Sequence, residues 1–340
     1  MKTNHHFATG VERCELLHQQ FIDRVRSKEL PEVDTAWEKS SISKQESVDV
    51  FHSQLMSRHL DYYARKLKQQ NRSYYTIGSA GHEGSATIAQ VLRLNDMAFL
   101  HYRSGAFMLE RARKIPEMNM VKEMLLSLMA SREDSISQGR HKVLGSLPLF
   151  VPPQTSTIAS HLPKAVGMAA AIARAKTTKI SAVVPHDSVV ICSFGDASVN
   201  HAAALSAFNT AQWIVKKKYP LPIIFLCEDN GLGISVPTPD DWIESMYSGN
   251  PYMHYIQADG LDVVSVYEAT TKAEWIARVE KKPVFLHVKC VRLLGHAGVD
   301  YEPDYREISD IEKTEAQDPL LYSAAILLKN EILTAEEILL

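Results

Sequence analysis

Cysteine is scarce in this 340-residue sequence: the chain has four cysteines, and no two of them form a Cys-x-x-Cys pair. Three of them, Cys192, Cys227 and Cys290, lie inside apolar runs, which predicts buried free thiols rather than disulfides or zinc ligands. Long hydrophobic runs are missing too, because the densest apolar stretch covers only residues 165–173 and a membrane span needs roughly 18 residues. The N-terminus also lacks the apolar core of a signal peptide. We therefore expect a soluble cytoplasmic protein with no membrane partner.

An excess of charge of either sign is absent as well. The chain has 40 acidic and 37 basic side chains, so its formal net charge is -3. Such a balance produces no global field that would hold a polyanion, which argues against nucleic-acid binding. With 45% hydrophobic and 23% charged residues, the composition is typical of a globular protein and excludes disordered and coiled-coil classes. The length suits two domains or one large α/β domain.

The sequence pattern changes near residue 155. Before it, apolar spacing predicts helices over 11–26, 46–70 and 116–131, with a glycine-punctuated loop over 71–84. After it, expected helices (161–176, 202–218 and 267–280) alternate with short apolar runs expected to be strands (188–194, 222–227 and 283–291). This alternation predicts an α/β fold with a doubly wound, mostly parallel sheet flanked by helices. We divide the chain into an N-terminal arm with helices (1–70), a central α/β domain (71–310) and a C-terminal helical extension (311–340).

Polar residues follow two of the expected strands, at the sheet edge where α/β proteins bind ligands. Asp196 follows the first strand and Asn230 follows the second, so neighbouring strands would bring both side chains together. Their carboxylate and amide oxygens suit magnesium, and a helix opening after Ser198 would aim backbone amides at an anion. Either half alone is more often an ordinary turn. The pair, across one β-α-β unit, predicts a pocket for a magnesium diphosphate.

The same segments carry a family resemblance. GDASVNHAAALSAFNTA, followed by PIIFLCEDNGLGIS, resembles the thiamin diphosphate motif in the form typical of the alpha subunit of 2-oxo acid dehydrogenases. Four more segments resemble that subunit in the same order: GSAGHEGSATIAQVL, FLHYRSGAFML, QTSTIASHLPKAVG and VRLLGHAGVDYEPDYR. The resemblance covers about residues 74–305 and implies that the central domain has the thiamin-diphosphate-binding fold.

Residue by residue, the resemblance implies a cofactor site. Asp196, Asn230 and the backbone carbonyl of Leu232 match magnesium ligands, and Tyr102 and Arg103 match the pair that binds the diphosphate. Without the resemblance, Arg103 would be interpreted as a surface side chain. The remaining matches are two aminopyrimidine contacts (Ser156 and Ile158), the diphosphate turn (Gly195, Ala197 and Ser198) and the loop histidine at the reactive end of the cofactor (His296). His296 is expected to titrate near neutrality and to act catalytically as a proton exchanger.

Three departures from the family pattern stand close to the expected diphosphate. Ala197 replaces the third glycine of the motif, and Glu228 and Asp229 bring negative charge where relatives can have arginine and asparagine. The potassium ion of some relatives is not predicted. Glu228 and Asp229 motivate an alternative hypothesis, a non-catalytic binding subunit that keeps the fold but has lost cofactor affinity. An unrelated nucleotide-binding protein is disfavoured because both Gly-x-Gly-x-x-Gly and a Walker loop are missing.

The resemblance implies an oxidoreductase that decarboxylates a 2-oxo acid with thiamin diphosphate and magnesium and passes the acyl unit to a lipoyl group. In this family a beta subunit supplies the carboxylate that activates the cofactor, so we expect a beta subunit or beta domain, in a heterotetramer, and a lipoyl acyltransferase as partners. GHEG at residues 81–84 favours branched-chain substrates, while pyruvate and acetoin remain open.

Thr334 is the expected N-cap of a last helix, and the sequence stops at Leu340, which suggests the alpha-like part of a longer fused chain or a truncated product.

Overall fold

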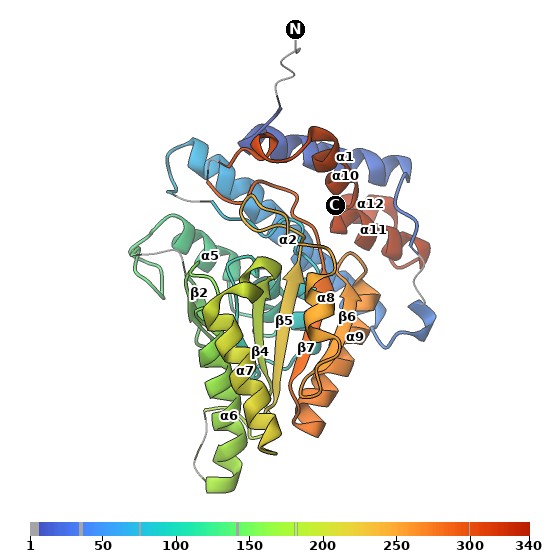
Figure 1. The fold of residues 1–340 in the computed structure, drawn as a ribbon. Coiled ribbons are helices and arrows are strands. Elements are labelled where there is room, and N and C mark those ends of the chain that lie inside the picture. Colours follow the sequence, from blue (N-terminus) through green and yellow to red (C-terminus); the bar gives the residue numbers. More distant parts are fainter. Residues whose placement is uncertain are drawn as a thin grey trace.

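A parallel β-sheet lies at the centre of the fold. The computed structural model describes residues 7–33, 37–74, 76–140, 143–179, 181, 183–298 and 300–340. Within them, five strands form one sheet in the order β1-β4-β5-β7-β6, and every neighbouring pair is parallel (Figure 1). The strands are β1 (Met97–Phe99), β4 (Val190–Gly195), β5 (Ile223–Asp229), β6 (His254–Asp259) and β7 (Val284–Lys289). The predicted α/β class with a parallel sheet is confirmed.

Two of these strands were not expected from the sequence. β1 has only three residues, too few for a recognisable apolar run. β6 forms an edge of the sheet, and most of its side chains are exposed or half-buried, so it lacks the continuous apolar run of a buried strand. A separate antiparallel pair, β2 (Leu144–Ser146) and β3 (Val151–Gln154), was not expected either.

Helices cover both faces of the sheet. Buried side chains of α6 (Leu162–Thr178), α7 (Ala202–Lys216) and α8 (Trp242–Tyr247) share one core with Val190, Cys192 and Phe225. Side chains of α3 (Ser85–Val91), α4 (Gly105–Ala112) and α9 (Val263–Trp275) share another with Ile191, Ile224 and Leu286. Adjacent strand residues thus point to opposite faces, and both faces are apolar because both are covered. The chain continues after α9 as a short π-helix (Ile276–Glu280).

The helices at the two ends of the chain pack together. They are α1 (Gly10–Ser27), α2 (Lys44–Gln69), α10 (Ile308–Ala316), α11 (Pro319–Lys329) and α12 (Ala335–Leu339), and they lie together beyond one end of the sheet (Figure 1). Phe21, Phe51, Leu321 and Ile338 bury their side chains in one shared cluster. The three-part division at residues 70 and 310 stays a prediction, although its first and last segments are in direct contact.

Two local predictions are confirmed. Thr334 caps α12, its hydroxyl accepting from Glu337 N in a capping box. The cysteines are free thiols, and Cys192 and Cys227 are buried as predicted. Cys290 is half-buried, so its predicted burial is wrong. Among the described residues, no helix has both the length and the apolar character that a membrane span requires.

Candidate functional site

The site lies where β4 and β5 end. The two strands are parallel neighbours, and Gly195 at the end of β4 pairs with Glu228 near the end of β5. Asp196 and Asn230 therefore leave the sheet at the same edge, as the sequence predicts, and Leu232 follows Asn230 by two residues. Gly231 between them has φ +71°, a left-handed turn conformation that glycine adopts without strain. One β-α-β unit thus brings the three predicted magnesium-ligating positions to one edge.

Asp196 has the environment of a cation ligand. Its side chain is 1% exposed, and its Oδ2 atom has no hydrogen-bond partner in the described chain. Burial raises the pKa of the carboxyl group to about 6, with the nearby Asp229 adding to the rise. A buried carboxylate oxygen without a donor is costly, so a divalent cation would relieve it. Asn230 adds an amide oxygen, which accepts from Leu232 N (3.1 Å). The donor set fits magnesium.

A 3₁₀ turn separates β4 from α7. Residues 196–200 form this turn, and α7 begins at Ala202, where the helix predicted over 202–218 also begins. Gly195, Ala197 and Ser198 therefore lie at and within the turn, and the predicted helix follows Ser198 as expected, while its role in binding an anion stays a prediction. The helix begins at Ala202 because His201 takes the N-cap position, its Nδ1 accepting from Ala203 N (3.1 Å).

Arg103 is a buried cation, so the surface interpretation is wrong. Its side chain is 4% exposed, and it donates to the carbonyl oxygens of Gly78 (2.7 Å) and His296 (3.0 Å). Its guanidinium also lies over the Tyr102 ring, 5.1 Å from the centroid. Within the described residues none of its hydrogen bonds goes to a carboxylate, and burial lowers its pKa. A buried guanidinium without an anionic partner is suited to bind one.

His296 is neutral at physiological pH in this arrangement. Arg103 Nη2 lies 3.1 Å from His296 Nδ1, and since the guanidinium can only donate, Nδ1 accepts and Nε2 carries the proton. Burial and the charges of Arg103 and Arg292 lower the pKa of the imidazole to about 4. The expectation of titration near neutrality is therefore wrong. Asp300 holds the loop by accepting from His296 N (2.6 Å), and Tyr305 donates to the same carboxylate oxygen (2.7 Å).

Ser156 and Ile158 lie on the loop between β3 and α6. Ser156 is half-buried, and the Ile158 side chain is 46% exposed. Among the described residues, neither side chain makes a hydrogen bond with the other predicted site residues, so their roles stay predictions. The loop itself is tied to β4, because His161 Nε2 lies 2.6 Å from the backbone oxygen of Ser193. This contact keeps the loop at the strand end that carries Asp196.

His161 should make the protein sensitive to acid. It is 1% exposed, its Nδ1 has no partner in the described chain, and burial lowers its pKa to about 4. Because the folded-state pKa lies below the unfolded value of about 6.5, the neutral ring stabilises the fold above pH 6.5. That stability is lost as the pH falls through 4, up to about 3 kcal/mol. Urea unfolding at several pH values should show a smaller acid loss for His161→Gln than for wild type. The exposed His186→Gln control should behave as wild type; an equal acid loss in His161→Gln would contradict the assignment.

Three buried residues of the site were missed by reasoning from the sequence. His82, His101 and Glu228 each offer a ligand atom, and these atoms lie within 4.8 Å of one another. Only Glu228 had a signal in the sequence, as a departure from the family pattern. The two histidines stand inside matching segments, directly before Glu83 and Tyr102, but nothing in their spacing shows that the chain brings them together.

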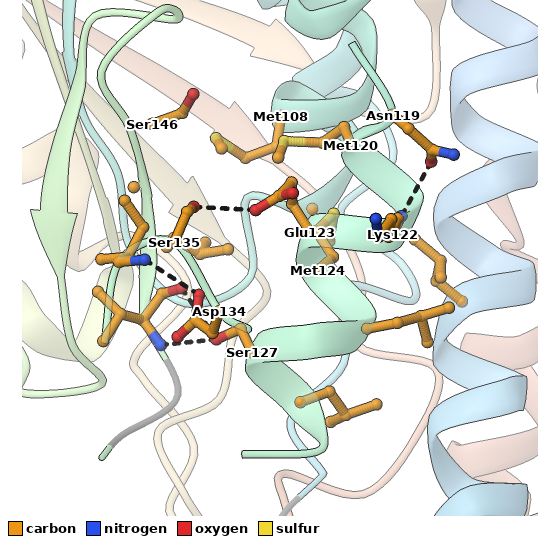
Figure 2. A pocket seen from close by; sticks show the side chains of 18 of the residues that line it. Met108, Asn119, Met120, Lys122, Glu123, Met124, Ser127, Asp134, Ser135 and Ser146 are labelled. Carbon is orange, nitrogen blue, oxygen red and sulfur yellow. Dashed lines mark hydrogen bonds between the residues drawn. The ribbon is translucent and has the colours of Figure 1, made fainter. Parts of the chain in front are cut away.

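A cavity of about 620 Å³ opens next to Tyr102. Its wall is rich in methionine, and Figure 2 shows Met108, Met120 and Met124 gathered on one side of it. Across from them, Ser135 donates to Glu123 (2.9 Å), as Figure 2 also shows. Methionine side chains adapt to irregular apolar ligands, and the volume lies in the range typical of small-molecule sites. The cavity can therefore accept an aliphatic group beside the candidate site.

Comparison with known proteins gives a consistent result. Residues 52–339 match the model of the family described as dehydrogenase E1 component. The chain is 26% identical over 284 residues to the mitochondrial 2-oxoisovalerate dehydrogenase subunit alpha of Homo sapiens, covering 82% of this chain and 59% of that protein. It is 27% identical over 282 residues to the Bos taurus protein of the same name, covering 81% and 57%. With the 2-oxoisovalerate dehydrogenase subunit alpha of Bacillus subtilis (strain 168), identity is 26% over 303 residues, covering 87% and 86%. The chain thus spans less than two thirds of the length of the mammalian relatives.

Proposed function

The chain belongs to the dehydrogenase E1 component family, and from that membership we propose that it is the alpha subunit, or the alpha-like part, of a 2-oxo acid dehydrogenase of the branched-chain type. The observation that carries the proposal is the buried Asp196 carboxylate, whose Oδ2 atom has no partner in the described chain. It stands at the carboxyl edge of β4, beside Asn230 on β5, where this family's motif places a magnesium ion. The names of the relatives support the substrate class.

We propose that thiamin diphosphate and magnesium bind at this edge. Asp196 Oδ2, the Asn230 side-chain oxygen and the Leu232 carbonyl would hold the magnesium ion, and Arg103 with Tyr102 would bind the diphosphate. The 3₁₀ turn that contains Ala197 and Ser198 would offer backbone amides to the same group. When bound, the cofactor supplies the electron sink for decarboxylation of a 2-oxo acid.

The role of His296 follows from its tautomer. Because Arg103 donates to Nδ1, the Nε2 atom carries a proton that it can donate to a substrate or acyl oxygen. The lowered pKa keeps the ring uncharged, so His296 acts as a hydrogen-bond donor and not as a cation. The backbone contact from Asp300 keeps the ring in this position.

The partners and substrate are part of the same proposal. A beta subunit or beta domain would complete the active site, within a heterotetramer located in the cytoplasm, and a lipoyl acyltransferase would accept the acyl unit. The methionine-rich cavity beside Tyr102 supports a substrate with an aliphatic side chain over pyruvate or acetoin.

One observation favours a second candidate function, a non-catalytic subunit that keeps the fold. Glu228 is 3% exposed, and it adds a buried carboxyl group beside the expected diphosphate. Repulsion between that carboxylate and a diphosphate would weaken cofactor binding.

Calorimetric titration with thiamin diphosphate and magnesium distinguishes the two functions. We expect heat that depends on magnesium, and binding that is roughly 10- to 100-fold weaker for Arg103→Gln because a buried charge-assisted contact is lost. The beta subunit from the same source should be present in a parallel titration. Absence of heat in both titrations would overturn the catalytic proposal and favour the non-catalytic subunit.

A further inference from the structure

Two histidines and a glutamate converge in the interior, from three separate segments. His82 lies in the loop before α3, His101 follows β1, and Glu228 lies near the end of β5. Their exposed fractions are 1%, 7% and 3%, and one ligand atom from each lies within 4.8 Å of the others. The motif that implies the magnesium site gives none of these three residues a role.

Glu228 is poorly neutralised in this cluster. Its Oε2 atom has no hydrogen-bond donor in the described chain, although His101 Nδ1 lies 3.2 Å away. Its Oε1 atom is 3.8 Å from His82 Nδ1. A buried carboxylate oxygen without a donor costs free energy, and a cation bound between the carboxylate and the two imidazoles would relieve that cost.

We propose that His82, His101 and Glu228 form a binding site for a divalent cation of the zinc type in the cofactor-free chain. Two imidazole nitrogens and one carboxylate oxygen are a common zinc ligand set, with water as the fourth ligand. Metal–ligand bonds of about 2.0–2.1 Å place tetrahedral ligand atoms about 3.3 Å apart. His101 Nδ1 lies 3.2 Å from Glu228 Oε2, close to that value, and His82 Nδ1 lies 3.8 Å from the other carboxylate oxygen, Oε1. Side-chain rotations would bring the three ligand atoms from within 4.8 Å of one another to the spacing of a bound cation.

A neighbouring residue already orients one of the two rings. His82 Nε2 lies 2.9 Å from Asn230 Nδ2, and a partner on the second ring nitrogen fixes the orientation of a metal-bound histidine. His101 would bind through Nδ1, the atom nearest Glu228, so a bound cation would replace the contact of this atom with Ser104 Oγ (3.1 Å). Because Asn230 occupies Nε2, the His82 ligand atom is Nδ1, which faces Glu228.

Asn230 also restricts when the site can be occupied. Metal binding through His82 Nδ1 leaves the proton on Nε2, which then needs an acceptor, so the Asn230 amide must turn its oxygen toward His82. The same oxygen is the proposed magnesium ligand. Asn230 can serve only one of the two sites at a time, and the zinc-type site therefore belongs to the cofactor-free chain.

The test is a cobalt titration of metal-free protein without thiamin diphosphate. Cobalt reports its coordination by visible absorption, and zinc should displace it. Titrations are done in a His5→Ala/His6→Ala background, because these adjacent histidines in the sequence could bind metal on their own. We expect a single tight site with the strong absorption of four-coordinate cobalt. Glu228→Gln and His101→Gln should each weaken binding by at least the roughly 10- to 100-fold that loss of a ligand's hydrogen-bond partner costs.

His186→Gln is the matched control, because His186 is exposed and outside the cluster. Circular dichroism and thermal unfolding without metal establish that each variant is folded. For the parent protein, zinc should also raise the melting temperature, and this shift should vanish in Glu228→Gln. Weak binding with six-coordinate spectra, or equal affinity in the control and in both cluster variants, would overturn the proposal. The titration contains no cofactor, so its failure is distinguishable from failure of the proposed function.

Discussion

Asp196→Asn should abolish the magnesium-dependent binding of thiamin diphosphate and at the same time stabilise the cofactor-free fold. The carboxylate is 1% exposed and its Oδ2 atom has no partner in the described chain, so in the absence of a cation it destabilises the protein. Asparagine has nearly the same shape and carries no charge. We expect cofactor affinity to fall at least about 100-fold and the free energy of unfolding to rise by about 1–3 kcal/mol. Calorimetry measures the affinity, and urea unfolding measures the stability.

Asp187→Asn is the control for Asp196→Asn. Asp187 is exposed and pairs with Arg93 at the surface, so its replacement should change neither quantity by much. Two results would contradict the assignment of Asp196 as a metal ligand. One is retained magnesium-dependent binding by Asp196→Asn, and the other is a loss of stability in the cofactor-free state, which would assign the carboxylate a structural role.

The sheet illustrates how far the sequence predicts this fold. β4, β5 and β7 are apolar on both faces, so continuous runs of apolar residues identify them. β1 is fixed by its pairing with β4, and β6 by its pairing with β7, contacts between segments far apart in the chain. The local sequence pattern contains no information about such pairings, so these two strands could not be predicted from it.

The residues of the candidate site also divide into those that the sequence predicts and those that it does not. Asp196 and Asn230 were predictable because each directly follows a buried strand, and parallel strands bring their carboxyl ends together. The burial of Arg103 and the lowered pKa of His296 depend on each other, through a contact between residues 193 positions apart in the sequence. The cluster of His82, His101 and Glu228 is equally non-local. The sequence therefore predicts which residues can act as ligands here. It does not predict the charge state of the site residues, because that state depends on tertiary contacts.

Arg58→Met should have the largest effect on stability. Arg58, on α2, is 2% exposed and donates through Nε to Glu83 (2.7 Å) and through both Nη atoms to Asp318 (2.7 and 2.8 Å). Glu83 lies in the loop before α3, and Asp318 is the N-cap of α11, so one guanidinium joins the N-terminal helices, the central domain and the C-terminal helices. Methionine keeps most of the apolar stem but leaves two buried carboxylates without their cation. We expect the free energy of unfolding to fall by about 3–5 kcal/mol, measured by urea unfolding.

The exposed pair between Arg93 and Asp187 is the control for Arg58, and Arg93→Met should cost at most about 1 kcal/mol because solvent screens that pair. A rescue variant separates lost charge pairing from lost packing. Adding Glu83→Gln and Asp318→Asn to Arg58→Met removes both unpaired charges, and asparagine still caps α11. The triple variant should regain a large part of the lost stability, because the cost arises mainly from the uncompensated carboxylates. If it is no more stable than Arg58→Met, the loss comes from packing, and the proposed electrostatic link between the two ends of the chain is wrong.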